Sequence, residues 1–276
     1  MISPFLPPLL EAEVISLFPN LKSVDSLKPG AEGAVFKAID NNSQREILLK
    51  IYGPDHQHRR TELEIAKLKE IDSPYLVTLY GSGKKVIRGL DCYYIITNFI
   101  SGDNLQALLE SGKKLSEQET IRLIHCISLA IEALWAVDVV HCDIKPENII
   151  LDTNGDFILI DLGLAKHLDA DAESLTEYGI IFGTKGYLAP EQFLGRKNLT
   201  LRADLYALGI VAYQCLAGYH PYNFRQDIML NTPIPKFPQE VNIINTLEKV
   251  IYKLTELRAF KRPKGWTEIF DILGVE

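Results

Sequence analysis

Apolar and polar positions in the first third of the chain predict strands around a single helix. Two β-rich runs flank Asp-Asn-Asn-Ser, a turn composition, and together predict a hairpin. Two further runs are predicted as strands joined by a glycine-rich, basic loop. An apolar stripe with period 3.6 predicts a helix next to them. The predicted elements are strands 34–39, 47–51, 76–80 and 92–99, a turn at 40–43, a loop at 81–89 and a helix at 61–71.

The pattern becomes helical after a short connector at 101–103. The sequence Ser116-Glu117-Gln118-Glu119 is a capping box that opens a long helix. Residues 201–216 are apolar nearly all round, which predicts a helix buried in a large core. The apolar side of the long helix is formed by Ile121, Ile124, Ile131 and Leu134. The remaining predicted elements are a strand at 157–160 and helices at 245–257 and 266–273.

This order of elements predicts an α+β fold with two lobes. We expect an N-terminal extension at 1–23, a small β-rich lobe with one helix at 24–100 and a larger helical lobe at 101–276. A hinge is expected near 98–103, and the two lobes together are expected to form one catalytic domain.

Composition narrows the class of protein. The 276 residues carry a net charge of −7, a poor match to nucleic-acid binding, which needs clustered positive charge. The four cysteines are far apart, which excludes a disulfide scaffold or a zinc finger and favours a cytoplasmic location. No apolar run has the length of a membrane span, and prolines near the N-terminus argue against a secretory signal. We therefore expect no nucleic-acid or membrane partner.

Candidate chemistry is concentrated in a few motifs. The sequence His141-Cys142-Asp143-Ile144-Lys145-Pro146-Glu147-Asn148 is followed by Asp161-Leu162-Gly163 and then by Gly183-Thr184-Lys185-Gly186-Tyr187-Leu188-Ala189-Pro190-Glu191. Upstream lie Gly30-x-x-Gly33-x-Val35 and Ile47-Leu48-Leu49-Lys50. In order and spacing, over about residues 24–273, these motifs resemble the eukaryotic-type (Hanks-type) Ser/Thr protein kinases.

The resemblance implies transfer of the γ-phosphate of ATP to Ser or Thr hydroxyls of protein substrates, with the kinase itself as one candidate substrate. Asp143 would orient the acceptor hydroxyl and take its proton, and Lys145 would contact the transferring phosphate. Asn148 and Asp161 offer hard oxygen ligands of the kind that Mg²⁺ prefers. Lys145 together with Thr184 indicates a Ser/Thr-directed enzyme.

Lys50 ends a strand that is otherwise apolar, and a lone lysine there is costly unless it is paired. Glu64 lies on the apolar stripe of the following helix, and an ion pair between the two would match the family's lysine and glutamate. Two alternatives stay open: Thr61-x-x-Glu64 is also a capping box, and Glu62 is a rival partner.

The nucleotide site is implied by the same resemblance. Gly30 and Gly33 would let the backbone approach phosphates, although Lys28 replaces the family's first glycine and Glu32 places a negative charge at the loop's tip. Thr97 would be the gatekeeper. Backbone groups of Asn98 and Ile100 would meet adenine between apolar faces formed by Val35, Leu48 and Leu151, and Leu48 would narrow the pocket because alanine is usual there.

The helical lobe carries residues expected to act as scaffold. Asp204 resembles the aspartate that ties down the catalytic loop, and Glu191 with Arg262 resembles a structural ion pair. Cys142 replaces an arginine that pairs with an activation-loop phosphate in many relatives. We therefore expect that a phosphate at Ser174, Thr176 or Tyr178 is not the main switch, and that packing or a protein partner orders this loop. The alternative is that another basic residue, such as Lys166, serves in place of the arginine.

Two rival functions share this fold. A non-catalytic pseudokinase, acting as a nucleotide-binding or scaffold module, would have lost Lys50, Asp143 or Asp161, all of which are present. A small-molecule kinase would not need the segment from Gly183 to Glu191, which resembles the family's peptide-binding platform. Fold alone does not decide between these functions.

Overall fold

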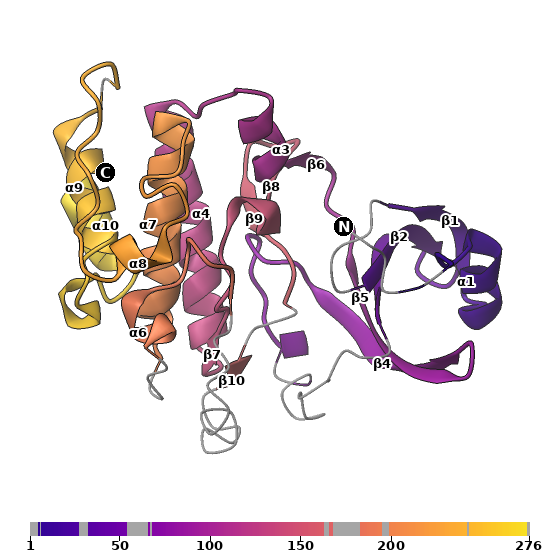
Figure 1. Ribbon diagram of the computed structural model, residues 1–276. Coiled ribbons are helices and arrows are strands. Elements are labelled where there is room, and N and C mark those ends of the chain that lie inside the picture. The colour runs from indigo at the N-terminus through magenta and orange to yellow at the C-terminus, as the bar shows by residue number, and fades with distance from the viewer. Residues whose placement is uncertain are drawn as a thin grey trace. The chain divides into compact units, whose positions relative to one another are not determined.

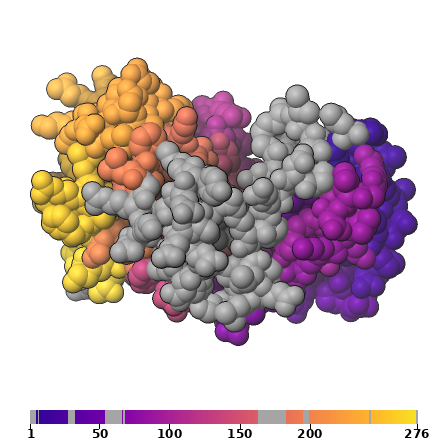
Figure 2. Space-filling model, turned by 60° about the horizontal axis from the view of Figure 1, so that its bottom comes forward, coloured from indigo at the N-terminus to yellow at the C-terminus, as the bar shows by residue number. Residues whose placement is uncertain are grey.

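The computed structural model of the chain describes residue 5 and residues 7–27, 33–53, 66, 68–162, 183–194, 199–241 and 243–274, together with the backbone of 166–167. Residues outside these ranges are grey in Figures 1 and 2. The chain divides into an N-terminal unit, Met1–Ile71 with Val77–Ile100, and a C-terminal unit, Asp72–Leu76 with Ser101–Glu276.

The N-terminal unit is built on a five-stranded antiparallel sheet with strand order β1-β2-β3-β5-β4. The predicted hairpin at 34–39 and 47–51 is confirmed as β2 and β3, joined by a turn. The strands are β1 (Leu21–Ser26), β2 (Gly33–Asp40), β3 (Glu46–Tyr52), β4 (Leu79–Ile87) and β5 (Leu90–Asn98).

The prediction of a loop at 81–89 is wrong. These residues form most of β4, which pairs with β5 and leaves only Arg88 and Gly89 as the turn. Glycine and lysine are poor strand formers, but pairing with the apolar strand β5 outweighs this weak local preference. Leu76, predicted to begin the strand, instead forms an isolated bridge to Leu159. The helix predicted at 61–71 lies mostly outside the described residues; Leu68 is helical and buried, and Ile71 is not in the helix.

A short helix, α1 (Glu11–Leu17), packs against β1 (Figure 1). The sequence pattern predicted no element in this region. Val14 and Phe18 are buried in one apolar cluster with Phe36 and Leu49, and the Phe18 ring meets the Tyr94 ring edge-on at 4.9 Å. Residues near the N-terminus therefore cover one face of the sheet and belong to its core.

The C-terminal unit is a set of packed helices with two small sheets. Helices α4, α7, α9 and α10 lie side by side in Figure 1, and the last two form the yellow surface in Figure 2. The capping box at Ser116 is confirmed, with hydrogen bonds in both directions between Ser116 and Glu119. Ile121, predicted on the apolar side of α4, is only half-buried.

Helix α7 is buried along nearly its whole length, as its all-round apolar sequence predicted, and helix 266–273 is confirmed as α10. Helix α9 ends at Leu254, three residues earlier than predicted. The helices of this unit are α3 (Leu105–Glu110), α4 (Glu117–Trp135), α6 (Pro190–Phe193), α7 (Leu201–Ala217), α8 (Gln226–Met229), α9 (Asn245–Leu254) and α10 (Trp266–Leu273). Two 3-10 turns lie at Pro146–Asn148 and Ala259–Lys261. The strands are β6 (Gly102–Asn104), β7 (Val139–Val140), β8 (Ile149–Asp152), β9 (Phe157–Leu159) and β10 (Lys166–His167).

Candidate active site

The segment between β7 and β8 carries most of the predicted chemistry, and Asp204 fixes its backbone. Asp204, near the start of the buried helix α7, accepts hydrogen bonds from the backbone N–H groups of His141 (2.8 Å) and Cys142 (2.9 Å). Cys142 has φ of +68°, a conformation that L-residues rarely adopt without such restraint. The predicted tie between Asp204 and this loop is confirmed. Burial raises the pKa of Asp204 to about 7, although the two N–H donors act in the opposite direction.

The Asp143 carboxylate is the centre of a compact polar cluster. Its Oδ2 lies 2.9 Å from Lys145 Nζ, and its Oδ1 accepts a 2.6 Å hydrogen bond from Thr184 Oγ1. Thr184 in turn accepts a hydrogen bond from Lys145 Nζ at 2.7 Å. The Asn148 amide nitrogen donates to Asp143 Oδ2 at 3.1 Å and to its carbonyl oxygen at 2.9 Å. Three side chains thus hold the carboxylate in one orientation.

Asn148 and Asp161 are the residues that could hold a metal ion. Both hydrogen bonds of the Asn148 side chain use its nitrogen, which directs its carbonyl oxygen away from Asp143. Asp161 lies just beyond β9 with φ of +64°, in the left-handed region. Within the described ranges no three His, Cys, Asp or Glu side chains cluster as a metal site. One amide and one carboxylate oxygen suit Mg²⁺, which is commonly held by one or two protein oxygens together with substrate phosphates.

The N-terminal unit brings several other predicted residues onto one face of its sheet. Val35 pairs with Lys50 across β2 and β3, and Leu48 pairs with Thr97 across β3 and β5. Directly paired residues point to the same side, as do residues two apart on a strand. Val35, Leu48, Lys50 and Thr97 therefore share a face, opposite to the face that α1 covers.

Lys50 is almost fully buried, and its ammonium lies 4.8 Å from the centre of the Tyr52 ring, a cation–π distance. Its predicted partner Glu64, and the rival Glu62, lie outside the described residues, as does Gly30. At Gly33 the need for glycine comes from the sheet itself, because a Cβ there would stand 2.3 Å from the Ile51 carbonyl oxygen.

The last residues of β5 already make hydrogen bonds. The Asn98 N–H donates to the Thr78 carbonyl at 3.2 Å, and Thr97 Oγ1 donates to the Asn98 carbonyl at 3.2 Å. That carbonyl oxygen retains a second lone pair for another donor. Ile100 is half-buried after the strand, and Leu151 lies half-buried in β8 of the C-terminal unit.

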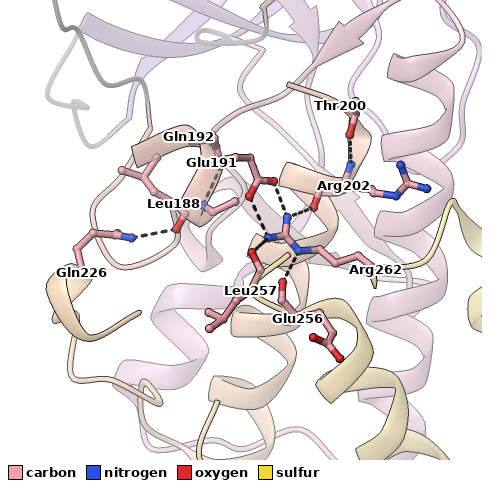
Figure 3. A network of polar contacts seen from close by, with 10 residues as sticks. Leu188, Glu191, Gln192, Thr200, Arg202, Gln226, Glu256, Leu257 and Arg262 are labelled. Carbon is pink, nitrogen blue, oxygen red and sulfur yellow. Dashed lines mark hydrogen bonds and ion pairs between the residues drawn. The ribbon is translucent and has the colours of Figure 1, made fainter. Parts of the chain in front are cut away.

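The predicted ion pair of Glu191 and Arg262 is confirmed (Figure 3). Arg262 donates to Glu191 Oε1 at 2.6 Å and to Oε2 at 3.0 Å. Its other hydrogen bonds reach the carbonyl oxygens of Arg202, Glu256 and Leu257. The pair therefore joins α6 to α7 and to the chain before α10.

Three further polar residues help to hold the Gly183–Glu191 segment, and no sequence motif predicted them. Gln192 accepts from the Ala189 N–H and donates to the Cys142 carbonyl. Gln226 accepts from the Gly186 N–H and donates to the Leu188 carbonyl, and Figure 3 shows the second of these two bonds. His220 Nε2 lies 2.8 Å from the Gly186 carbonyl. Their only signal in the sequence is a polar residue within an apolar or aromatic stretch, which does not identify a partner.

Comparison with known proteins agrees with this geometry. Residues 22–271 match the protein kinase domain family. The chain belongs to the protein kinase family. The predicted two-lobed α+β kinase fold, with a sheet in one unit and helices in the other, is therefore confirmed.

Curated relatives of this kinase domain include bacterial proteins named serine/threonine-protein kinases. It is 32% identical over 215 residues to PknD of Mycobacterium tuberculosis, which covers 76% of the chain and 31% of the relative. It is 29% identical over 224 residues to PknA of Corynebacterium glutamicum, which covers 77% of the chain and 47% of the relative. The chain thus spans about a third to a half of these longer proteins. No helix in the described ranges is long and apolar enough to cross a membrane.

Proposed function

We propose that this kinase domain transfers the γ-phosphate of ATP to Ser or Thr hydroxyls of protein substrates. The observation that carries the proposal is the Asp143 carboxylate, held by Lys145, Thr184 and Asn148. A carboxylate fixed in this way can accept a hydrogen bond from an acceptor hydroxyl and orient its oxygen for in-line attack.

The proposed reaction assigns one role to each residue of the cluster. As the acceptor oxygen bonds to the γ-phosphorus and the bond to the β,γ-bridging oxygen breaks, the hydroxyl proton moves to Asp143. The Lys145 ammonium stabilises negative charge on the transferred group. Asn148 and Asp161 would hold Mg²⁺, which when bound neutralises the phosphate charge.

The proposed nucleotide contacts in the N-terminal unit follow its shared sheet face. Glu64 would hold Lys50 in place to bind phosphate, and Gly30 and Gly33 would shape the loop beside it. Val35 and Leu48 would pack on adenine, with Thr97 as gatekeeper and the backbone of Asn98 and Ile100 as hydrogen-bonding groups. In the C-terminal unit Leu151 is proposed as a further apolar contact. A protein substrate, a regulatory protein partner and a cytoplasmic location complete the proposal.

The test compares phosphoryl transfer with nucleotide binding in one variant. Asp143→Asn should reduce transfer from labelled ATP by about 10²- to 10⁴-fold, the range for losing a general base. Mg·ATP affinity measured by calorimetry should stay close to that of the wild type. Asp271→Asn, an exposed carboxylate on α10, is the matched control and should retain full transfer. A wild-type protein that binds Mg·ATP but transfers no phosphate would instead be a pseudokinase.

A further inference from the structure

An exposed aromatic ring lies against the segment that carries Thr184. Phe224 has 52% of its surface exposed, and its ring stacks on the buried His220 ring at 4.2 Å and 25°. It also meets the Tyr187 ring edge-on at 6.1 Å. At Gly186 a Cβ would stand 2.8 Å from Phe224 Cδ1, so only glycine leaves room for this ring. One side of the ring is thus packed, and the rest faces solvent.

The backbone that presents this ring is strained. Asn223 and Phe224 have φ of +50° and +60°, the left-handed region, which asparagine tolerates and which is unusual for a bulky residue such as phenylalanine. His220 stabilises this turn, because its Nδ1 accepts hydrogen bonds from the N–H groups of Tyr222 (3.1 Å) and Phe224 (3.0 Å). Burial lowers the pKa of His220 to about 4, which keeps the ring neutral and able to accept. Strain retained at an exposed apolar residue indicates a functional constraint.

The Phe224 ring lies within reach of a peptide whose hydroxyl is bound at Asp143. Thr184, which donates to Asp143, is separated from Gly186 by one residue, a span of at most about 7 Å along the chain. An extended peptide advances about 3.3 Å per residue. A peptide whose hydroxyl is at Asp143 can therefore bring a side chain within three residues of the acceptor onto Phe224.

We propose that Phe224 is a specificity-determining residue, which selects acceptor proteins with a large apolar side chain within three residues of the acceptor Ser or Thr. This inference rests on the proposed kinase function. The acceptor's apolar side chain would cover the exposed part of the ring, so the preference comes from burial of apolar surface on both partners.

The experiment measures phosphorylation of synthetic peptides with one Ser in a Gly/Ala background. A single Leu or Phe is placed in turn at each of the three positions on either side. The wild type should show about tenfold higher kcat/KM for at least one apolar placement than for the unsubstituted peptide, the scale of a modest hydrophobic contact. Phe224→Asn, which fits the left-handed backbone, should abolish this preference by raising KM while kcat stays unchanged. Its melting temperature should remain near that of the wild type.

The control is Phe260→Asn, an exposed phenylalanine in the 3-10 turn Ala259–Lys261, which should keep the preference. Equal rates on all peptides, a preference that survives in Phe224→Asn, or a loss of preference only through unfolding would each overturn the inference and leave the kinase function standing. A wild type that phosphorylates none of the peptides, nor itself or any protein substrate, would overturn both.

Discussion

Two polar networks of the C-terminal unit differ in how fully their hydrogen-bonding capacity is used. Arg262 makes five hydrogen bonds, which match its five N–H donors, and its side chain is fully buried. At Asp143, three donors from the described residues reach a carboxylate that has about four acceptor sites. Among the described residues, the Arg262 network has no donor left for a ligand, whereas the Asp143 carboxylate has an acceptor site left, which the proposed function assigns to a substrate hydroxyl.

The largest loss of stability is expected when the saturated Arg262 network is disturbed. Arg262→Met should lower the free energy of unfolding by about 3–5 kcal/mol, because it leaves Glu191 buried without its cation. Chemical denaturation measures the change. Lys264→Met removes an exposed lysine two residues away and should cost little. A loss similar to that of the control would show that the Arg262 network does not stabilise the fold.

A second buried carboxylate, Asp204, should make the stability of the protein depend on pH. Within the described residues no cation pairs with Asp204, and burial raises its pKa to about 7. The folded state then binds more protons than the unfolded state, so stability should fall as pH rises from about 4 to about 7, by roughly 1 kcal/mol per pH unit. Asp204→Asn should flatten this slope in denaturation series at several pH values. An unchanged slope would contradict the assignment.

The unsaturated network should respond in activity rather than in stability. Thr184→Val removes the hydroxyl that links Lys145 to Asp143, and phosphoryl transfer should fall about 10- to 100-fold through lost positioning. The melting temperature should change little, and Thr184→Ser should retain most activity. If Thr184→Val unfolds the protein instead, the cluster is scaffold like the Arg262 network.

The smallest expected change in melting temperature concerns Arg88 in the N-terminal unit, at the tip of the β4–β5 hairpin. Arg88 donates to Glu13 and to the carbonyl oxygens of Pro7 and Pro8 from an exposed position. Arg88→Gln should produce a small fall in melting temperature, larger than that of Lys84→Gln on the same hairpin. Equal effects would show that these contacts contribute nothing measurable.

Contiguous features of the sequence predicted most of the fold and the centre of the site. Residues 140–151 and helices α7 and α10 could be predicted because their motif or periodicity is local. Helix α1 was missed because the prolines at 4, 7 and 8 obscured the short amphipathic stretch after them. The hydrogen bond from Thr184 to Asp143 spans 41 residues and two loops, and loops have no periodicity to reveal such a contact.

The same limit hid the Gly186–Phe224 contact. Each residue alone is unremarkable, since glycine in a loop and an exposed phenylalanine both have ordinary explanations. Only their proximity in space shows why glycine is required at one position and why strain is kept at the other.

The cover that α1 provides for the sheet has a consequence for the order of folding during synthesis. Val14 and Phe18 leave the ribosome before Tyr94, which the Phe18 ring contacts and which is made about 75 residues later. The N-terminal apolar residues must therefore wait, exposed, for most of the sheet. Such long-range contacts slow folding, and this interval is when the nascent chain most needs protection from association with its neighbours.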